Sequence, residues 1–207
     1  HDVESLIHKR RKSWINKCAN LAESIVVHNS LSCEELIKRI SGDNKRKIKI
    51  IAHGNFIDLP VKADRRLAAE YFNLDNNKKH LLFFGMIKSS KGLEVLIDAM
   101  KNVNPNTDLI IAGRTRDVSF NHYRIIIEKL KLSKRILPII RYITNEERNL
   151  MFSIADIVVL PYHQVYQSGV LLMAMSYGVP VVTSDLPANK IMIDDKNGIL
   201  FKAGDSS

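Results

Sequence analysis

The sequence lacks several features that would place it in a specialised protein class. It contains only two cysteines, Cys18 and Cys33, whose spacing matches neither a metal site nor a redox motif. Two isolated thiols are typical of a reducing compartment. No apolar run approaches the ~20 residues that span a bilayer, and no signal peptide is visible. These absences exclude a disulfide scaffold and a membrane-spanning helix, and we expect a cytoplasmic protein.

Acidic residues are outnumbered by basic ones, 22 against 31, which gives a net charge of +9. Such a balance fits a phosphate ligand, nucleic acid or an anionic membrane surface, or merely a solvated basic surface, and charge alone does not choose among them. A hydrophobic content of 45% with 26% charged residues is typical of a soluble globular protein. The first residue is His1 rather than Met, which predicts a fragment or a processed chain.

Short apolar, β-branched runs recur along the chain with room for a helix between them. Runs of this kind are typical of parallel strands that are buried on both faces. Between them, residues such as Leu93, Leu96, Ile97 and Met100 follow helical periodicity. The pattern predicts an α/β fold with doubly wound parallel sheets of the Rossmann type. The eight predicted strands lie at residues 24–28, 47–52, 81–87, 108–113, 136–142, 157–161, 179–183 and 199–201.

A polar turn near Leu74–Lys79 predicts a domain boundary. Residues 1–75 hold too few strands for a complete Rossmann-like domain, so we expect part of an N-terminal domain there. Residues 76–207 are expected to form a C-terminal domain that is truncated at its end.

Two loops are candidates for binding an anion. The first follows the strand at 81–87 and carries Gly85, Lys88 and Lys91 before a helix begins. The second follows the strand at 157–161 and ends in Ser168-Gly169, a good helix N-cap followed by a residue with no side chain. Loops at the carboxyl ends of parallel strands border the ligand crevice, and helix N-termini attract phosphate. A solvated turn and an ordinary capped helix are the alternative interpretations.

The succession of these segments resembles the GT-B-fold glycosyltransferases of glycosyltransferase family four, the glycosyl transferases group 1, which act with retention. The stretches that carry the resemblance are FGMIKSSKGLEVLIDA, IIAGR, RYITNEERNLMFSIADIVVLPY, QSGVLLMAMSYGVPVVTSD and NGILF, with AESIVVHNS and IKIIAHGN upstream. The resemblance covers essentially the whole chain. It implies sugar transfer from a nucleotide diphosphate sugar, UDP- or GDP-linked, to a glycan or lipid-linked acceptor in bacterial surface polysaccharide synthesis. It also implies that no metal and no cofactor are required.

The resemblance implies roles for residues in the first loop and after the strand at 136–142. Lys91 matches the phosphate-binding lysine of the family, and Lys88 stands where a subgroup carries arginine. Gly85 matches the glycine that leaves space for donor and acceptor groups. Tyr142 and Ile143 match the segment whose backbone reads the nucleotide base, although Tyr142 also fits an ordinary aromatic residue at a strand end.

Ser168, Gly169 and Val170 match the loop whose backbone amides meet the diphosphate. His1 resembles a histidine that lies beside the reacting sugar, and it is the candidate catalytic residue. The chain departs from the family where two glutamates are common, because Val165 and Met173 stand in their places. Met173 puts the expected hydrogen bonds to the ribose in doubt.

The basic stretch at residues 8–12, followed by Trp14, fits contact with anionic lipids as well as a solvated helix face. Peripheral contact with the inner face of the membrane is one expectation. Nucleic-acid binding is not expected, since no recognition motif accompanies the charge. Two alternatives to a transferase stay open. One is a non-catalytic nucleotide-sugar-binding module or inactive fragment, and the other is a nucleotide-sugar epimerase.

Overall fold

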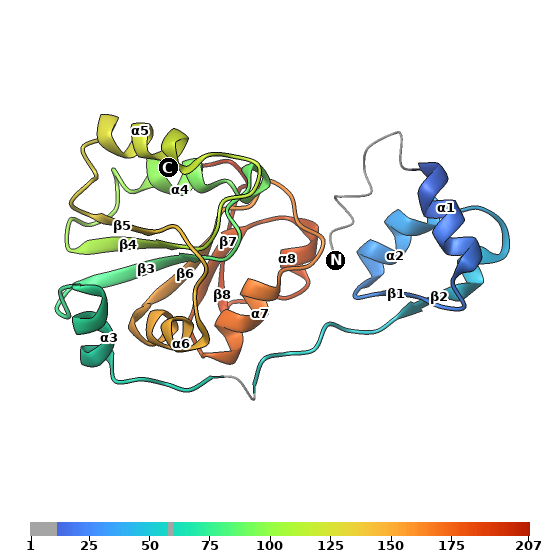
Figure 1. Ribbon diagram of the computed structural model, residues 1–207, viewed down its shortest axis with the longest axis horizontal. Coiled ribbons are helices and arrows are strands. Elements are labelled where there is room, and N and C mark those ends of the chain that lie inside the picture. The colour runs from blue at the N-terminus through green and yellow to red at the C-terminus, as the bar shows by residue number, and fades with distance from the viewer. Residues whose placement is uncertain (1–11, 58–59) are drawn as a thin grey trace. The chain divides into compact units, whose positions relative to one another are not determined.

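The computed structural model describes residues 12–57 and 60–207, and these fall into two compact units that divide between Gly54 and Asn55. Figure 1 shows both units with their elements labelled. Within the described ranges, no helix has both the length and the apolar character that a membrane span requires.

The first unit contains a two-stranded parallel sheet, with Ile25 of β1 opposite Ile48 of β2. Asn29 caps α2, because its side chain accepts a hydrogen bond of 2.7 Å from the Ser32 amide. The elements are α1 (Lys12–Leu21), β1 (Ile25–Val27), α2 (Ser30–Ile37), the 3-10 helix η3 (Gly42–Lys47) and β2 (Ile48–Ile50).

The second unit is a six-stranded parallel sheet in the order β5-β4-β3-β6-β7-β8. In chain order within the sheet this is 3-2-1-4-5-6, the order of a Rossmann fold. The strands are β3 (Lys79–Phe84), β4 (Thr107–Ala112), β5 (Ile136–Ile139), β6 (Ile157–Leu160), β7 (Val181–Ser184) and β8 (Gly198–Phe201). The helices are α3 (Arg65–Phe72), the 3-10 helix η4 (Ser89–Lys91), α4 (Leu93–Ala99), α5 (Phe120–Lys129), α6 (Asn145–Ile154), α7 (Gly169–Ser176) and α8 (Pro187–Lys190).

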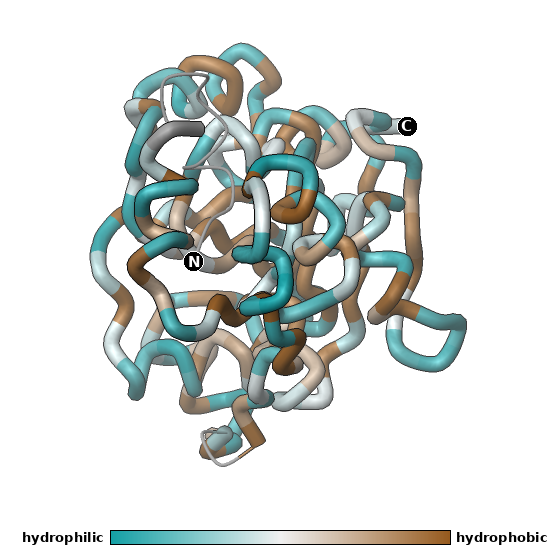
Figure 2. Tube along the Cα trace, turned by 90° about the vertical axis from the view of Figure 1, so that its right-hand side faces the viewer, coloured by the Kyte–Doolittle hydropathy of each residue, from teal (hydrophilic) through white to brown (hydrophobic). Residues whose placement is uncertain are grey.

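Helices cover both faces of this sheet, with α4 and α5 on one side and α3 and α6 on the other (Figure 1). Every residue of β4 is buried, as expected for a central strand covered on both faces. Figure 2 colours the chain by hydropathy and shows that many of its outer turns are hydrophilic. Each of the eight predicted runs overlaps a strand, so the predicted α/β class with parallel sheets is confirmed.

The compact units divide between Gly54 and Asn55, upstream of the boundary that the sequence predicts at Leu74–Lys79. The difference arises because the segment before β3 is bonded to the second unit. The Phe56 amide donates to Ser176 Oγ of α7 at 3.1 Å, and the Ala63 amide donates to Ser153 Oγ of α6 at 2.9 Å. The polar turn near Leu74 is therefore a connection inside the second unit.

Helix α3 is held in that unit by one arginine. The Arg65 guanidinium donates to the Ile154 carbonyl at 2.8 Å, to the Lys78 carbonyl at 3.0 Å and to Asp156 Oδ2 at 3.0 Å. Such a set of charge-assisted hydrogen bonds fixes the helix against both α6 and the start of β3. Arg65, which makes these hydrogen bonds, does not belong to a periodic pattern in the sequence.

The connection from β5 to α6 is held by the buried carboxylate of Glu147, which is 3% exposed. It accepts a hydrogen bond of 2.7 Å from Arg141 Nη1 and one of 3.0 Å from the Thr144 amide, which completes a capping box. The hydrogen bonds from the Arg141 guanidinium lower the pKa of Glu147 to about 2. The charge of this one residue therefore sets the conformation of residues 141–147.

We expect Glu147→Gln to lower the free energy of unfolding by about 1.5–3 kcal/mol at pH 7, the usual value of hydrogen bonds to a charged group. The pKa of Glu147 is lower in the folded than in the unfolded chain, so its contribution is complete above about pH 4.3 and is lost as the pH falls toward 2. Urea unfolding at pH 7 and pH 3 measures this. Between pH 7 and pH 3, Glu147→Gln should lose less stability than the unchanged protein. The control variant Glu128→Gln, at an exposed position on α5, should lose as much stability as the unchanged protein. Parallel pH dependences for Glu147→Gln and the unchanged protein would contradict the assignment.

Candidate functional site

The strand order places one crevice at the carboxyl ends of β3 and β6. These two strands are neighbours, with Leu81 opposite Ile157, yet the chain leaves them toward opposite edges of the sheet. A Rossmann-type sheet binds ligands at this switch point, because the two diverging connections leave a gap there. The loops that border it are residues 85–92 after β3 and residues 161–168 after β6. They are the two loops that the sequence singled out.

The two loops are joined by their backbones. Gly92 has a φ of +62°, and a Cβ on it would lie 1.9 Å from the Pro161 carbonyl oxygen, so no larger residue fits without movement. The His163 amide donates to the Ser90 carbonyl at 3.0 Å. His163 Nε2 also lies 2.6 Å from Glu94 Oε1 in the first turn of α4. The loop after β6 is thus fixed against the loop after β3.

Gly85 forms the floor of the crevice. Its φ is +105°, and a Cβ on it would lie 3.1 Å from Val170 Cγ2 at the start of α7. Gly113 directly follows β4, and a Cβ on it would lie 1.8 Å from the Gly85 carbonyl oxygen. Gly85, Val170 and Gly113 therefore meet in a region that has no room for additional side chains.

Lys91 supplies positive charge beside this floor. Its Nζ lies 3.7 Å from the ring centroid of Tyr162, which follows Pro161 in the second loop. The Tyr162 hydroxyl is 3.4 Å from Ser168 Oγ, at the start of α7. The structure therefore brings together the predicted residues Lys91 and Ser168, with the ring of Tyr162 between them.

Helix α7 points its N-terminus toward the same loops. Ser168 Oγ accepts a hydrogen bond from the Leu171 amide at 3.2 Å, as an N-cap does. The first helical amides, those of Gly169 and Val170, have no acceptor inside a helix. Nothing lies within 4 Å of the position of a Cβ on Gly169, so a ligand has room to approach this backbone. This arrangement suits an anion.

Lys88 occupies a different environment from Lys91. It precedes η4, where Ser89 bonds to Asp117 through its amide at 3.1 Å and its hydroxyl at 2.8 Å. Burial alone would raise the pKa of Asp117, but the hydrogen bonds from Ser89 and the charge of Lys88 lower it. The Lys88 charge therefore also acts on a carboxylate of the neighbouring loop.

Tyr142 and Ile143 lie after β5, two strands away from β3. Tyr142 is 61% exposed, and the Arg114 guanidinium lies over its ring at 5.1 Å from the centroid. The strand order places the loops after β5, β4, β3 and β6 in one row along the carboxyl edge. Neighbouring strands are ~4.8 Å apart, so a ligand that reaches from Tyr142 to the β3–β6 crevice must be elongated, with a span of ~12 Å.

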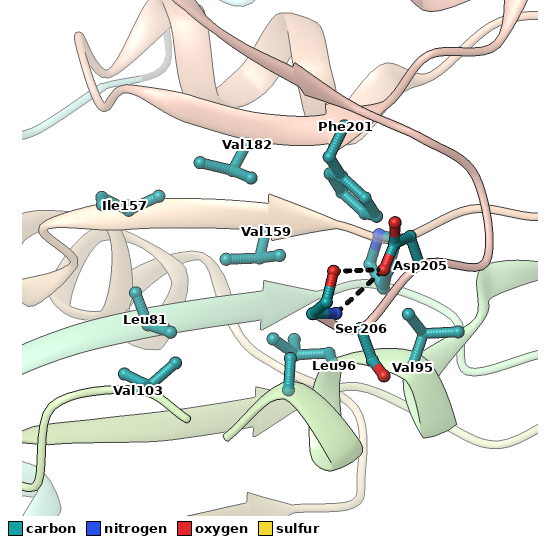
Figure 3. A pocket seen from close by; sticks show the side chains of 13 residues that line it. Leu81, Val95, Leu96, Val103, Ile157, Val159, Val182, Phe201, Asp205 and Ser206 are labelled. Atoms are coloured by element: carbon teal, nitrogen blue, oxygen red, sulfur yellow. Dashed lines mark hydrogen bonds between the residues drawn. The ribbon is translucent and has the colours of Figure 1, made fainter. Parts of the chain in front are cut away.

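An apolar cavity of about 290 Å³ lies elsewhere, between α4 and one face of the sheet. Figure 3 shows side chains from four strands and α4 pointing into it, with Asp205 and Ser206 at one end. Ser206 Oγ donates to Asp98 Oδ2 at 2.8 Å, so part of the polar surface there is already paired. A wall of Leu81, Val159 and Val182 offers a diphosphate no partner. The crevice at the strand ends is the better candidate site.

Two sequence expectations have no structural counterpart in the described residues. His1 and most of the basic stretch at residues 8–12 lie outside them.

Val165, which stands where the family often has its first glutamate, is 8% exposed, and Met173 is half-buried on α7. An ionised carboxylate would be costly at the buried position of Val165, so the apolar residue fits this loop.

Residues 78–207 match the family described as glycosyl transferases group 1, which is more than half of the chain. The chain belongs to this family. A mannosyltransferase from Xanthomonas campestris, GDP-mannose:glycolipid 4-beta-D-mannosyltransferase, is 33% identical over 117 residues, which is 56% of this chain and 33% of that protein. A D-inositol 3-phosphate glycosyltransferase from Xylanimonas cellulosilytica is 24% identical over 198 residues, covering 89% of this chain and 46% of that protein. The chain thus spans less than half the length of these relatives.

Solved structures show that this group 1 chain shares the GT-B fold. HepE from Anabaena in complex with UDP and glucose has a TM-score of 0.85 at 20% identity, covering 100% of this chain and 57% of that one. Sucrose-phosphate synthase from Thermosynechococcus elongatus has a TM-score of 0.82 at 20% identity, covering 99% of this chain and 51% of that one. The predicted Rossmann-like architecture is confirmed by these likenesses.

The sequence alone did not identify Tyr162 and Gly113 as residues of the candidate site. Tyr162 follows a buried strand and precedes a polar stretch, which is the available signal in the sequence. Gly113 ends a predicted strand, but its approach to Gly85 depends on the pairing of β3 with β4.

We expect Gly92→Ala to destabilise the second unit by several kcal/mol, because both its φ and the Pro161 carbonyl oppose a side chain. A residue forced into a left-handed conformation costs ~1–2 kcal/mol, and overpacking adds ~1–3 kcal/mol. Gly178→Ala is the matched control, since Gly178 has a φ of +68° and only the flexible Lys62 side chain 4.0 Å away. Chemical denaturation of both variants measures the difference. Equal losses of stability would show that the Gly92–Pro161 contact is unimportant.

Proposed function

We propose that this chain is the nucleotide-sugar-binding part of a glycosyltransferase. The observation that carries the proposal is the Lys91 ammonium over the ring of Tyr162, whose hydroxyl lies beside the Ser168 N-cap of α7, at the β3–β6 switch point. Both features favour negative charge at one place, as a leaving nucleotide diphosphate requires. Membership in the glycosyl transferases group 1 family supports it further.

The proposed donor lies along the carboxyl edge of the sheet. Its diphosphate contacts Lys91 and the amides of Gly169 and Val170, with Lys88 nearby. Gly85 leaves room for the sugar and the acceptor. The base lies toward Tyr142 and Ile143, whose loop is held by Glu147. A nucleoside diphosphate has the elongated shape that this row of loops demands.

In the proposed reaction, the bond between the anomeric carbon and the diphosphate oxygen breaks. An acceptor hydroxyl forms a bond to the same carbon from the same face and passes its proton to the departing diphosphate oxygen. The configuration of the sugar is then retained. Charge that develops on the leaving oxygens is stabilised by Lys91 and the α7 amides, which are already in place before the reaction. The proposed chemistry uses no metal ion, because the cation and the helix N-terminus supply the positive charge.

We infer a UDP- or GDP-linked donor and a glycan or lipid-linked acceptor, in the synthesis of a bacterial surface polysaccharide. Support comes from the Xanthomonas campestris relative, a GDP-mannose:glycolipid mannosyltransferase, and from the UDP and glucose bound to HepE. We place the protein in the cytoplasm, in peripheral contact with the inner face of the membrane through residues 8–12. His1 is the proposed catalytic residue.

A non-catalytic binding module is the second candidate. Met173 favours it, because a methionine cannot form the charged hydrogen bonds of the glutamate that it replaces. Incubation with UDP- and GDP-sugars and a lipid-linked acceptor separates the two functions, since a module binds the donor without releasing the nucleotide.

We expect Lys91→Ala to weaken binding of UDP or GDP, whichever the protein prefers, by at least ~1 kcal/mol, because a charged contact is lost. Lys88→Ala should weaken it less, since Lys88 shares its charge with Asp117. Calorimetric titration measures both, with the exposed Lys129→Ala on α5 as the control for lost charge. Unchanged affinity in Lys91→Ala would remove this loop from the site, and no binding of any nucleotide to the unchanged protein would overturn the proposal.

A further inference from the structure

We propose that Tyr162 is a positioning residue that holds the Lys91 ammonium at the diphosphate site through the face of its ring. This inference rests on the proposed function, since Tyr162 acts through Lys91 at the same crevice. Lys91 Nζ lies 3.7 Å from the Tyr162 centroid, well inside the ~6 Å over which a ring attracts a cation. Tyr162 follows β6 and Lys91 ends η4, so the contact connects the two loops that border the crevice.

The ring of Tyr162 is a fixed support. Its side chain is 1% exposed, and its hydroxyl lies 3.4 Å from Ser168 Oγ. The preceding residue, Pro161, is held against Gly92 by the close backbone approach described above. A ring that is enclosed in this way has one orientation, so the cation above it has a defined place.

Lys91 needs such a support, because a lysine side chain is long and loses much conformational freedom when it is held. In residues 12–57 and 60–207, Lys91 forms no salt bridge, whereas Lys78, Lys79, Lys101 and Lys190 each pair with an aspartate. A carboxylate partner would cancel the charge that a diphosphate requires. A neutral aromatic face holds the ammonium and leaves its charge and N–H donors available to the ligand.

The same side chain also touches the second anion-binding element. Ser168, which lies beside the Tyr162 hydroxyl, caps α7 through its bond to the Leu171 amide. The Tyr162 side chain therefore lies beside both the Lys91 cation and the start of α7. A ligand that uses both finds them already arranged, which lowers the entropic cost of binding.

The first test needs no nucleotide. Protons above an aromatic ring resonate upfield, so the ε-methylene protons of Lys91 should be shifted upfield in the NMR spectrum of the ligand-free protein. The signal is assigned by its loss in Lys91→Arg. Tyr162→Phe should keep the shift, because the ring remains, and Tyr162→Leu should abolish it. Ordinary lysine shifts for Lys91 in the unchanged protein would overturn the proposal, whatever the protein binds.

The second test is a double-mutant cycle with the preferred nucleotide, UDP or GDP. Tyr162→Leu should weaken binding about 3- to 30-fold, which corresponds to the usual strength of a cation–π contact. Tyr162→Phe should bind nearly as tightly as the unchanged protein. In a Lys91→Ala background, Tyr162→Leu should have little further effect, because the residue that it positions is gone.

The cycle also separates positioning from a general structural role. An equal loss of affinity from Tyr162→Leu with and without Lys91 would overturn the proposal, and so would unchanged or tighter binding by Tyr162→Leu. Thermal unfolding of each variant identifies any loss that comes from misfolding. If the unchanged protein binds neither nucleotide, the proposed function fails, and the NMR test still decides whether Tyr162 holds Lys91.

Discussion

The close approach of backbone segments at the carboxyl ends of the strands is the constraint on which the rest of the site depends. At Gly92 the main chain passes against the Pro161 carbonyl, and at Gly113 it passes against Gly85. A side chain at either position would separate loops that must lie together. Because the loops meet as bare backbone, a lysine from one and a tyrosine from the other come into contact, and the start of α7 stays beside them.

Charged side chains in the second unit have two kinds of partner. Carboxylates that fix the fold are satisfied by arginine, lysine and backbone amides, as Glu147 and Asp156 are. The cation at the crevice is instead held by an aromatic face, which does not neutralise it. A cation that binds phosphate must not be paired with a carboxylate, because a paired charge attracts an anionic ligand only weakly.

Local sequence patterns predicted the strands and the α/β class, because parallel strands that are buried on both faces consist of short apolar runs. Each such run overlaps a strand, and the loops with Lys91 and Ser168 were predicted to bind an anion from their positions after two of these runs. Residues joined across the fold were not recognised. The boundary at Leu74–Lys79 follows a real polar turn, but the Arg65 bonds that attach α3 to the second unit have no local signature.

The sequence by itself determined the alternation of strands and helices, the α/β class and the family, since these depend on periodicity and on short motifs within single loops. The tertiary structure decided which loops meet. It set β3 beside β6, brought the Tyr162 ring under Lys91 and joined Ser89 to Asp117. Those relations depend on strand order and on contacts between residues far apart in the chain, and no local pattern records them.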